Sequence, residues 1–267
     1  MWDPTAYLRF ADHRSRPFAE LLARVLLDDP RRIVDLGCGP GHLTAQLAAR
    51  WPRADVSGVD ADPAMVARAT ADHPRLRFTA GDAREWTPPA DLDLLVCHAV
   101  LQWVPGHPAL LARWAGELPA RSWVAVQVPG NNDTAAHRIV REVAGSPPWR
   151  SRLAAVAVPR PVPDPVDYAA LLHGTGAAAD VWETTYVHLL PAPAGEAHPV
   201  LRWLEGTGLR PVRAALPGDA DWQRYREAVQ ERLARAYPVR DGVVYYPFRR
   251  IFVAAQVRAA HAVEAAA

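Results

Sequence analysis

The chain has 267 residues, half of them hydrophobic, which suits one large domain or a domain that carries an insertion. Its formal net charge of +1 argues against a nucleic-acid-binding surface. No apolar run approaches the roughly 20 residues of a membrane span, and the N-terminus has none of the organisation of a signal peptide. Two cysteines, Cys38 and Cys97, fit neither a zinc site nor a disulfide framework. We therefore expect a cytoplasmic protein without a metal, nucleic-acid or membrane partner.

The first predicted elements surround a glycine-rich turn. A helix over 17–27 precedes a short buried strand over 33–36, and a second helix follows over 42–50. The turn between strand and helix reads Gly37-Cys38-Gly39-Pro40-Gly41, so that at three positions no Cβ blocks a ligand. Where a strand leads through a glycine turn into the first turn of a helix, free backbone N–H groups can bind a ligand.

The spacing of the glycines indicates which ligand. The order is D-x-G-x-G-x-G from Asp35 to Gly41, whereas a dinucleotide fingerprint is G-x-G-x-x-G and a P-loop needs a lysine that this chain lacks. The motif resembles the S-adenosylmethionine loop of class I methyltransferases. That cofactor carries an ammonium group, which suits an acid such as Asp35. The alternative is an ordinary strand–helix turn with glycines for tight packing.

The next three predicted strands each end in polar residues. The strand over 54–59 ends at Asp60, placed to accept both ribose hydroxyls of a nucleoside. The strand over 76–80 runs into Asp82, where the resemblance implies an acid that accepts the adenine amino group. The strand over 92–97 leads into His98. The predicted cofactor-binding residues are therefore Asp35, Gly37, Cys38, Gly39, Gly41, Asp60, Ala61, Asp82, Ala83, Cys97 and His98, although small buried residues remain the favoured interpretation of the two cysteines.

The alternation of strands and helices continues through the first half of the chain. Helices are predicted at 63–71 and 107–118 and a fifth strand at 122–128. This order predicts an α/β fold with a parallel sheet and right-handed crossovers. The predicted cofactor-binding core spans 17–129, preceded by an N-terminal lid segment over 1–16.

The pattern changes after Pro129. Helices are predicted over 134–144, 166–172, 199–205 and 219–237, a sixth strand over 181–190 and a seventh over 249–257. The methyltransferase resemblance implies a Rossmann-like, seven-stranded, mostly parallel sheet whose last strand is antiparallel. The insertions 130–180 and 191–242 would then form a helical lid that selects the substrate. Segments 181–190 and 243–258 complete the core, and 259–267 form a tail.

Further segments carry a closer resemblance. AVLQWVPGHP (99–108), TTYVHLL (184–190), WLEGTGLRP (203–211) and YPFRRIFVAA (246–255) are similar to the trans-aconitate 2-methyltransferase family. The resemblance implies methyl esterification of a carboxylate of a small polycarboxylic acid. Such a carboxylate is already ionised at pH 7, so catalysis by proximity and orientation needs no catalytic side chain. The predicted substrate-binding residues are Trp2, Tyr7, Gln102, Trp103, Asn131, His188, Tyr245, Arg249 and Arg250.

Adjacent residues on a strand point to opposite faces, so at most one of Arg249 and Arg250 is expected to contact the substrate. Another acceptor stays open: a malonyl thioester carboxylate, a phenol or a ring carbon. A nucleic-acid methyltransferase is disfavoured because Cys97-His98-Ala99-Val100 replaces the [DN]-P-P-[YF] motif of enzymes that act on base amino groups. A non-catalytic cofactor-binding regulator and a nicotinamide dehydrogenase are weaker alternatives.

Overall fold

The computed structural model describes residues 11–156 and 162–258, which form two compact units. The first unit contains the described residues up to Val128, together with Pro163–Glu183 and the described residues from Ile251 to Arg258. The second unit contains the described residues of Pro129–Val162 and Thr184–Arg250. The division assigns part of the predicted insertion 130–180 to the first unit.

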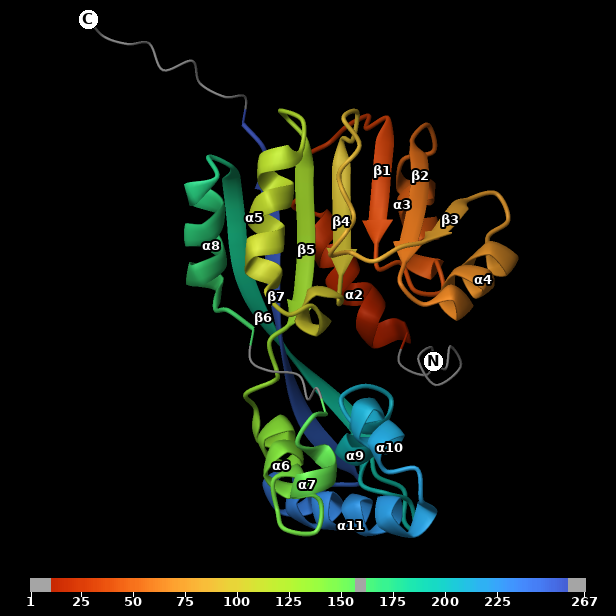
Figure 1. Cartoon of the computed structure of the whole chain (residues 1–267), viewed down its shortest axis with the longest axis vertical. Helices are drawn as coiled ribbons and strands as arrows, with labels where there is room; N and C mark the ends of the chain where they lie inside the picture. The colour runs from red at the N-terminus through yellow and green to blue at the C-terminus, as the bar shows by residue number, and fades with distance from the viewer. Residues whose placement is uncertain (1–10, 157–161, 259–267) are drawn as a thin grey trace, which may run out of the picture. The chain divides into compact units, whose positions relative to one another are not determined.

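Seven strands form one sheet in the order β3-β2-β1-β4-β5-β7-β6 (Figure 1). The strands are β1 Arg32–Leu36, β2 Asp55–Asp60, β3 Arg77–Ala80, β4 Leu94–His98, β5 Trp123–Pro129, β6 Ala178–Pro191 and β7 Val243–Gln256. The predicted seven-stranded Rossmann-like sheet is confirmed. Strands six and seven are longer than predicted.

The strands from β1 to β5 run parallel, and β7 runs against them. In the parallel part Ile33 lies opposite Val56 on one side and Leu94 on the other. The last strand pairs in the reverse direction, because Val257 N–H donates to Ser122 O at 2.9 Å, whereas farther along β5 the earlier Arg249 is the partner of Gly130. The predicted antiparallel last strand is confirmed.

Helices cover both faces of the sheet (Figure 1). The strand order reverses beside β1, because β2 lies on one side of it and β4 on the other. Right-handed crossovers therefore place the helices after β1 and β2 on one face of the sheet and the helix after β4 on the other face. The helices of the first unit are α2 Ala11–Leu22, α3 His42–Arg50, α4 Pro63–Asp72, α5 His107–Glu117 and α8 Pro165–Gly174, with the 3₁₀ turn η1 at Leu101–Trp103.

The first helix differs from the prediction in its position. Helix α2 begins at Ala11 and ends at Leu22, so Pro17 lies inside it rather than in its first turn. Phe18 and Leu21 are completely buried and anchor the helix to the core. A proline inside a helix removes one backbone hydrogen bond, and burial of these apolar side chains outweighs that loss.

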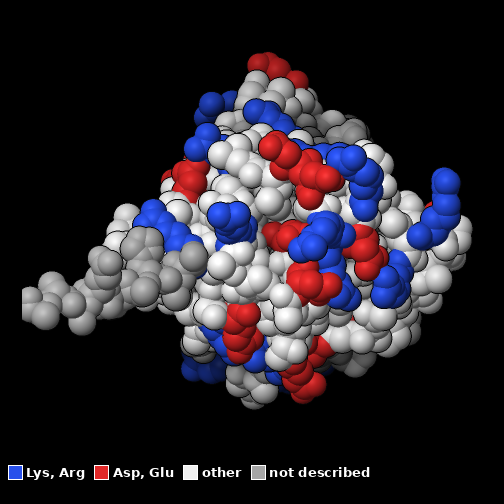
Figure 2. All heavy atoms as spheres, turned by 90° about the horizontal axis from the view of Figure 1, so that it is seen from above, with Lys and Arg blue, Asp and Glu red and all other residues white. Residues whose placement is uncertain are grey.

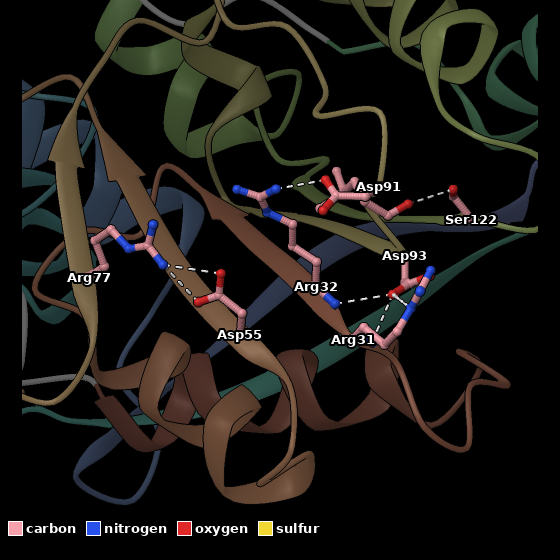
Figure 3. Close-up of polar contacts among 8 residues, drawn as sticks. Arg31, Arg32, Asp55, Arg77, Asp91, Asp93 and Ser122 are labelled. Atoms are coloured by element: carbon pink, nitrogen blue, oxygen red, sulfur yellow. Dashed lines mark hydrogen bonds and ion pairs between the residues drawn. The ribbon is translucent and has the colours of Figure 1, made fainter.

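Ion pairs occupy the edge where the parallel strands begin. Arg32 donates to Asp91 at 2.6 Å, Arg77 donates to Asp55 at 2.9 Å, and the Asp93 carboxylate accepts the Arg32 backbone N–H at 3.1 Å (Figure 3). On the face drawn in Figure 2, basic and acidic side chains are interspersed. Charge at this edge is therefore compensated locally. Ligands of such sheets bind at the opposite edge, where the parallel strands have their carboxyl ends.

The second unit contains the helices α6 Ala135–Ala144, α7 Arg150–Leu153, α9 Pro199–Glu205, α10 Arg210–Ala215 and α11 Asp219–Ala236. The sequence does not predict α7 or α10. Helix α11 packs on α6, and the Tyr225 hydroxyl donates to Val140 O at 2.9 Å. Helix α8 belongs to the first unit, where Tyr168 bonds to His107 of α5 at 2.6 Å.

Within the part of the chain that the structure describes, no helix is long and apolar enough to cross a membrane. The same residues contain no group of three His, Cys, Asp or Glu side chains that could hold a metal ion.

Candidate active site

The glycine turn between β1 and α3 is held by main-chain bonds to the end of β2. Gly37 N–H donates to Val59 O at 2.6 Å, and Cys38 N–H donates to the same oxygen at 3.0 Å. Each of the three glycines has a positive φ, between 55° and 83°. Because L side chains rarely adopt such values, the local backbone explains the glycine spacing.

The three glycines nevertheless have different surroundings. A Cβ on Gly37 would lie 2.1 Å from Val100 Cγ2, and one on Gly41 would lie 2.8 Å from Phe78 Cζ. At Gly39, no atom of the described residues outside the adjoining chain lies within 4 Å of the position of a Cβ. Gly37 and Gly41 therefore allow close packing inside the protein, whereas Gly39 faces open space that a ligand can use.

Asp60, at the end of β2, supports the same turn. One carboxylate oxygen accepts the Gly39 N–H at 2.8 Å, and the other accepts the Asp62 N–H at 2.9 Å. Burial raises the pKa of Asp60, and these two hydrogen bonds oppose the rise. Each oxygen keeps a lone pair, so the side chain can also accept hydroxyl groups.

Asp35, in the middle of the site, is almost completely buried at 2 % exposure. The Thr44 hydroxyl on α3 donates to its carboxylate at 2.6 Å. Burial raises the pKa of Asp35 to about 7, the Thr44 bond opposes this, and the charge of Asp60 adds to it. A buried carboxylate with this pKa gains most from a cationic partner.

Asp82, after β3, lies in a more exposed setting. Its carboxylate accepts the Arg84 backbone N–H at 2.8 Å and the Arg84 Nε–H at 3.0 Å. These bonds hold the pKa of Asp82 down at about 2. The adjacent Ala83 is buried, and Ala61, which follows Asp60, is exposed. An adenine amino group at Asp82 would therefore share a carboxylate that already binds a guanidinium.

The carboxyl end of β4 supplies Cys97 and His98. Cys97 has no exposed surface, and burial raises the pKa of both Cys97 and Cys38. His98 packs edge-to-face on Phe18 with ring centroids 5.4 Å apart. In η1, Gln102 is half-buried and Trp103 is 36 % exposed.

In the second unit, Asn131 lies in the turn before α6. Its side-chain Oδ1 accepts the Arg249 backbone N–H at 2.7 Å, and its main-chain oxygen accepts the Thr134 hydroxyl at 2.7 Å. Asn131 is 1 % exposed, and within residues 11–156 and 162–258 its Nδ2 has no hydrogen-bond partner. The amide therefore presents a buried donor group.

Strand β7 separates the predicted substrate residues by face. Tyr246, Phe248 and Arg250 alternate as buried residues, whereas Tyr245 on the other face is 46 % exposed. The Arg250 guanidinium lies 4.8 Å from the centre of the Phe248 ring. The Tyr246 hydroxyl is buried and finds no hydrogen-bond partner in the described part of the chain.

An aromatic cluster surrounds these side chains. His188 stacks on Trp203 of α9 with ring centroids 5.0 Å apart and lies 5.6 Å from the Phe248 ring. Trp203 also contacts Tyr246 edge-to-face. The second unit thus brings His188, Arg250 and Tyr246 into one cluster. Tyr245 lies on the opposite face of β7.

Comparison with known proteins connects this geometry to a family. A model described as a methyltransferase domain matches residues 33–118, the stretch from β1 through α5. A trans-aconitate 2-methyltransferase of Mycobacterium sp. (strain KMS) is 52% identical over 96% of this chain and 99% of its own length. The corresponding protein of Rhodococcus jostii (strain RHA1) is 51% identical over 97% of this chain and its full length.

The chain belongs to the trans-aconitate 2-methyltransferase family. It is therefore a methyltransferase that uses S-adenosylmethionine. Solved structures at low identity share the fold: the YcgJ protein of Bacillus subtilis matches with a TM-score of 0.59 at 13% identity, over 92% of this chain and 99% of its own. A phosphoethanolamine N-methyltransferase of Haemonchus contortus, 16% identical, matches with a TM-score of 0.53 over 91% of this chain and 53% of its own.

The residues of the first unit suit the cofactor of this methyltransferase family. The open space at Gly39, the buried carboxylate of Asp35 and the half-buried carboxylate of Asp60 offer room and acceptors to a ligand that carries hydroxyl and ammonium groups. Among the predicted substrate residues, Trp2 and Tyr7 lie outside the described residues.

Sequence reasoning did not place Thr44 at the candidate site. Thr44 bonds to Asp35, and its position nine residues along the chain, on the first turn of α3, is the signal that could have identified it. Of the two adjacent tyrosines at the start of β7, Tyr246 is buried, whereas the predicted substrate residue Tyr245 is exposed. Alternation along β7 separates the two tyrosines, but only the contacts of Tyr246 with Trp203 reveal which face is covered.

Proposed function

We propose that this chain is a carboxyl O-methyltransferase that forms a methyl ester on a small polycarboxylic acid, with trans-aconitate as the first candidate. The observation that carries the proposal is the similarity to relatives named trans-aconitate 2-methyltransferase, at 48 to 52% identity over nearly the whole chain. The proposed site of action is the cytoplasm.

The chemistry requires little from ionisable side chains. A carboxylate nucleophile is ionised at neutral pH, so no base has to remove a proton from it. When bound, the cofactor supplies an activated methyl group. The protein then has to hold the carboxylate oxygen near that group and to exclude water, and both tasks fall to binding and orienting residues.

We assign cofactor binding to the first unit. Asp60 is proposed to accept the ribose hydroxyls while it holds the Gly39 N–H, and Asp35 is proposed to face the ammonium of the methionine end. Asp82 and Ala83 are assigned to the adenine. Gly39 has the open space that this arrangement needs.

We assign recognition of the acid to the second unit. A polycarboxylate offers only acceptors, so it needs donors and positive charge. Arg250 supplies a buried guanidinium on the face of β7 that carries Tyr246, and His188 lies in the same aromatic cluster. Asn131 supplies a buried Nδ2 donor. Arg249 lies on the other face of the strand, and its main-chain N–H already holds Asn131 in place.

An activity screen with methyl-labelled cofactor tests the proposed acceptor. The acids should include trans-aconitate, cis-aconitate, citrate, isopropylmalate and a malonyl thioester, all at the same concentration. We expect kcat/KM for trans-aconitate to exceed that of every other acid. A clear preference for the thioester, or for an added phenol, would transfer the proposal to the alternative acceptor while leaving the cofactor site intact.

A further inference from the structure

The side-chain amide of Gln102 has a fixed orientation. Its Nε2 donates to the main-chain carbonyl of Ala99 at 2.7 Å. A carbonyl oxygen can only accept, so the nitrogen must face Ala99 and Oε1 must point elsewhere. Oε1 is buried and, among the residues that the structure describes, has no hydrogen-bond partner. The first unit therefore contains a buried acceptor that needs a donor.

The turn that carries Gln102 packs against the glycine turn. Ala99 adopts a positive φ of 58°, and its N–H donates to Gln127 O at 2.8 Å. The side chain of Val100, one residue later, fills the space that a Cβ on Gly37 would need. Such backbone strain persists only where the surroundings fix it, and it is common at ligand-binding sites. Gln102 thus lies in a rigid turn directly beside the cofactor loop.

Either the acid or the cofactor could supply the hydrogen-bond donor for Gln102 Oε1, and the chemistry of the two ligands decides between them. Ionised trans-aconitate has no hydroxyl group and therefore no hydrogen to donate to an oxygen. The methionine end of the cofactor carries an ammonium with three donors. We propose that Gln102 Oε1 accepts a hydrogen bond from this ammonium, so that Gln102 is a cofactor-positioning residue and not the substrate-binding residue that the sequence predicts.

The order of the strands favours the ammonium over the other donors of the cofactor. Strands β3 and β2 lie on one side of β1 and β4 on the other. The proposed adenine and ribose contacts, Asp82 and Asp60, follow β3 and β2. The methionine end is left for the side of β1 and β4, where Asp35 and Gln102 lie. The inference rests on the proposed cofactor contacts and on an acid without a hydroxyl group, such as trans-aconitate.

Two substitutions separate the acceptor from the bond to Ala99. Both Gln102→Met and Gln102→Glu lose the N–H that donates to Ala99, but only the glutamate keeps an oxygen acceptor. Calorimetry should therefore show S-adenosylhomocysteine binding at least fivefold more tightly to Gln102→Glu than to Gln102→Met. Equal affinities in the two variants would overturn the proposal.

A second comparison uses the ligand and remains informative if one variant fails to fold. The probes are S-adenosylhomocysteine and its analogue in which hydrogen replaces the amino group. Wild-type protein should discriminate between them more strongly than Gln102→Met, by at least threefold. Unchanged discrimination, with a raised KM for the acid, would return Gln102 to the substrate. Gln46→Met, the same change at an exposed position of α3, is the matched control and should behave as wild type.

Discussion

Replacing Asp35 by asparagine should stabilise the protein and weaken cofactor binding at the same time. The carboxylate is 2 % exposed, and burial raises its pKa to about 7. Asparagine keeps an oxygen that can accept the Thr44 hydroxyl but never carries a charge. The substitution therefore removes the free-energy cost of a buried charge and, with it, the proposed partner of the cofactor ammonium.

The magnitude follows from the pKa of Asp35, which rises from the usual 3.8 to about 7. Because the folded state holds the proton more tightly than the unfolded state, the free energy of unfolding falls as pH rises from about 4 to 7. The full difference corresponds to about 4 kcal/mol as an upper limit. Asp35→Asn should recover on the order of 1–3 kcal/mol at pH 8, or roughly 3–10 °C in melting temperature. At pH 4 its effect on the melting temperature should be small.

Cofactor affinity should change with pH in the opposite sense. If only the ionised carboxylate binds the ammonium, wild-type affinity for S-adenosylhomocysteine should rise about eightfold from pH 6 to 7.5. In Asp35→Asn the affinity should be weaker by on the order of 1.5–3 kcal/mol and independent of pH over this range. A variant that is less stable than wild type at pH 8, or that keeps the wild-type pH dependence of binding, would refute the reasoning about Asp35.

Four further predictions concern both units. Asp60→Ala should weaken cofactor binding by on the order of 2–3 kcal/mol in calorimetry, and unchanged affinity would remove Asp60 from the site. Gly39→Ala should mainly reduce cofactor affinity. Gly37→Ala should mainly lower the melting temperature, because its Cβ would meet packed atoms. The reverse pattern would contradict the roles assigned to the two glycines. Arg250→Gln should lower kcat/KM for the acid by a factor that corresponds to on the order of 2 kcal/mol, mostly through a higher KM, and Arg249→Gln should have little effect. A larger loss in Arg249→Gln would place the contact with the acid on the other face of β7. At saturating cofactor, kcat/KM for the acid should be flat from about pH 6.5 to 8.5, whereas a tenfold rise per pH unit would indicate a phenol.

The sequence predicts the fold of the first unit well because its signals are local. The glycine spacing reflects positive φ values within five residues, and the position of Asp60 follows from the length of one strand–helix–strand unit. The antiparallel direction of the last strand is predicted from the resemblance to class I methyltransferases. Strand β7 begins at Val243, before the predicted start at residue 249, and contains Pro247, a residue type that is rare inside sheets.

Features that depend on distant partners could not be predicted. Helix α8 belongs to the first unit through the contact of Tyr168 with His107, which lies 61 residues away along the chain. The choice of Tyr246 over Tyr245 depends on Trp203. Neither pairing leaves a periodic signal, because each is decided by packing between elements that are remote in the sequence.

The most direct test of carboxyl methylation is the chemical stability of the product. Wild-type protein should be incubated with methyl-labelled S-adenosylmethionine and trans-aconitate, and the labelled acid should then be treated with mild alkali. A methyl ester predicts label that depends on the acid and that alkali releases as volatile methanol. Label that stays on the product after alkali, or equal incorporation without the acid, would contradict carboxyl methylation.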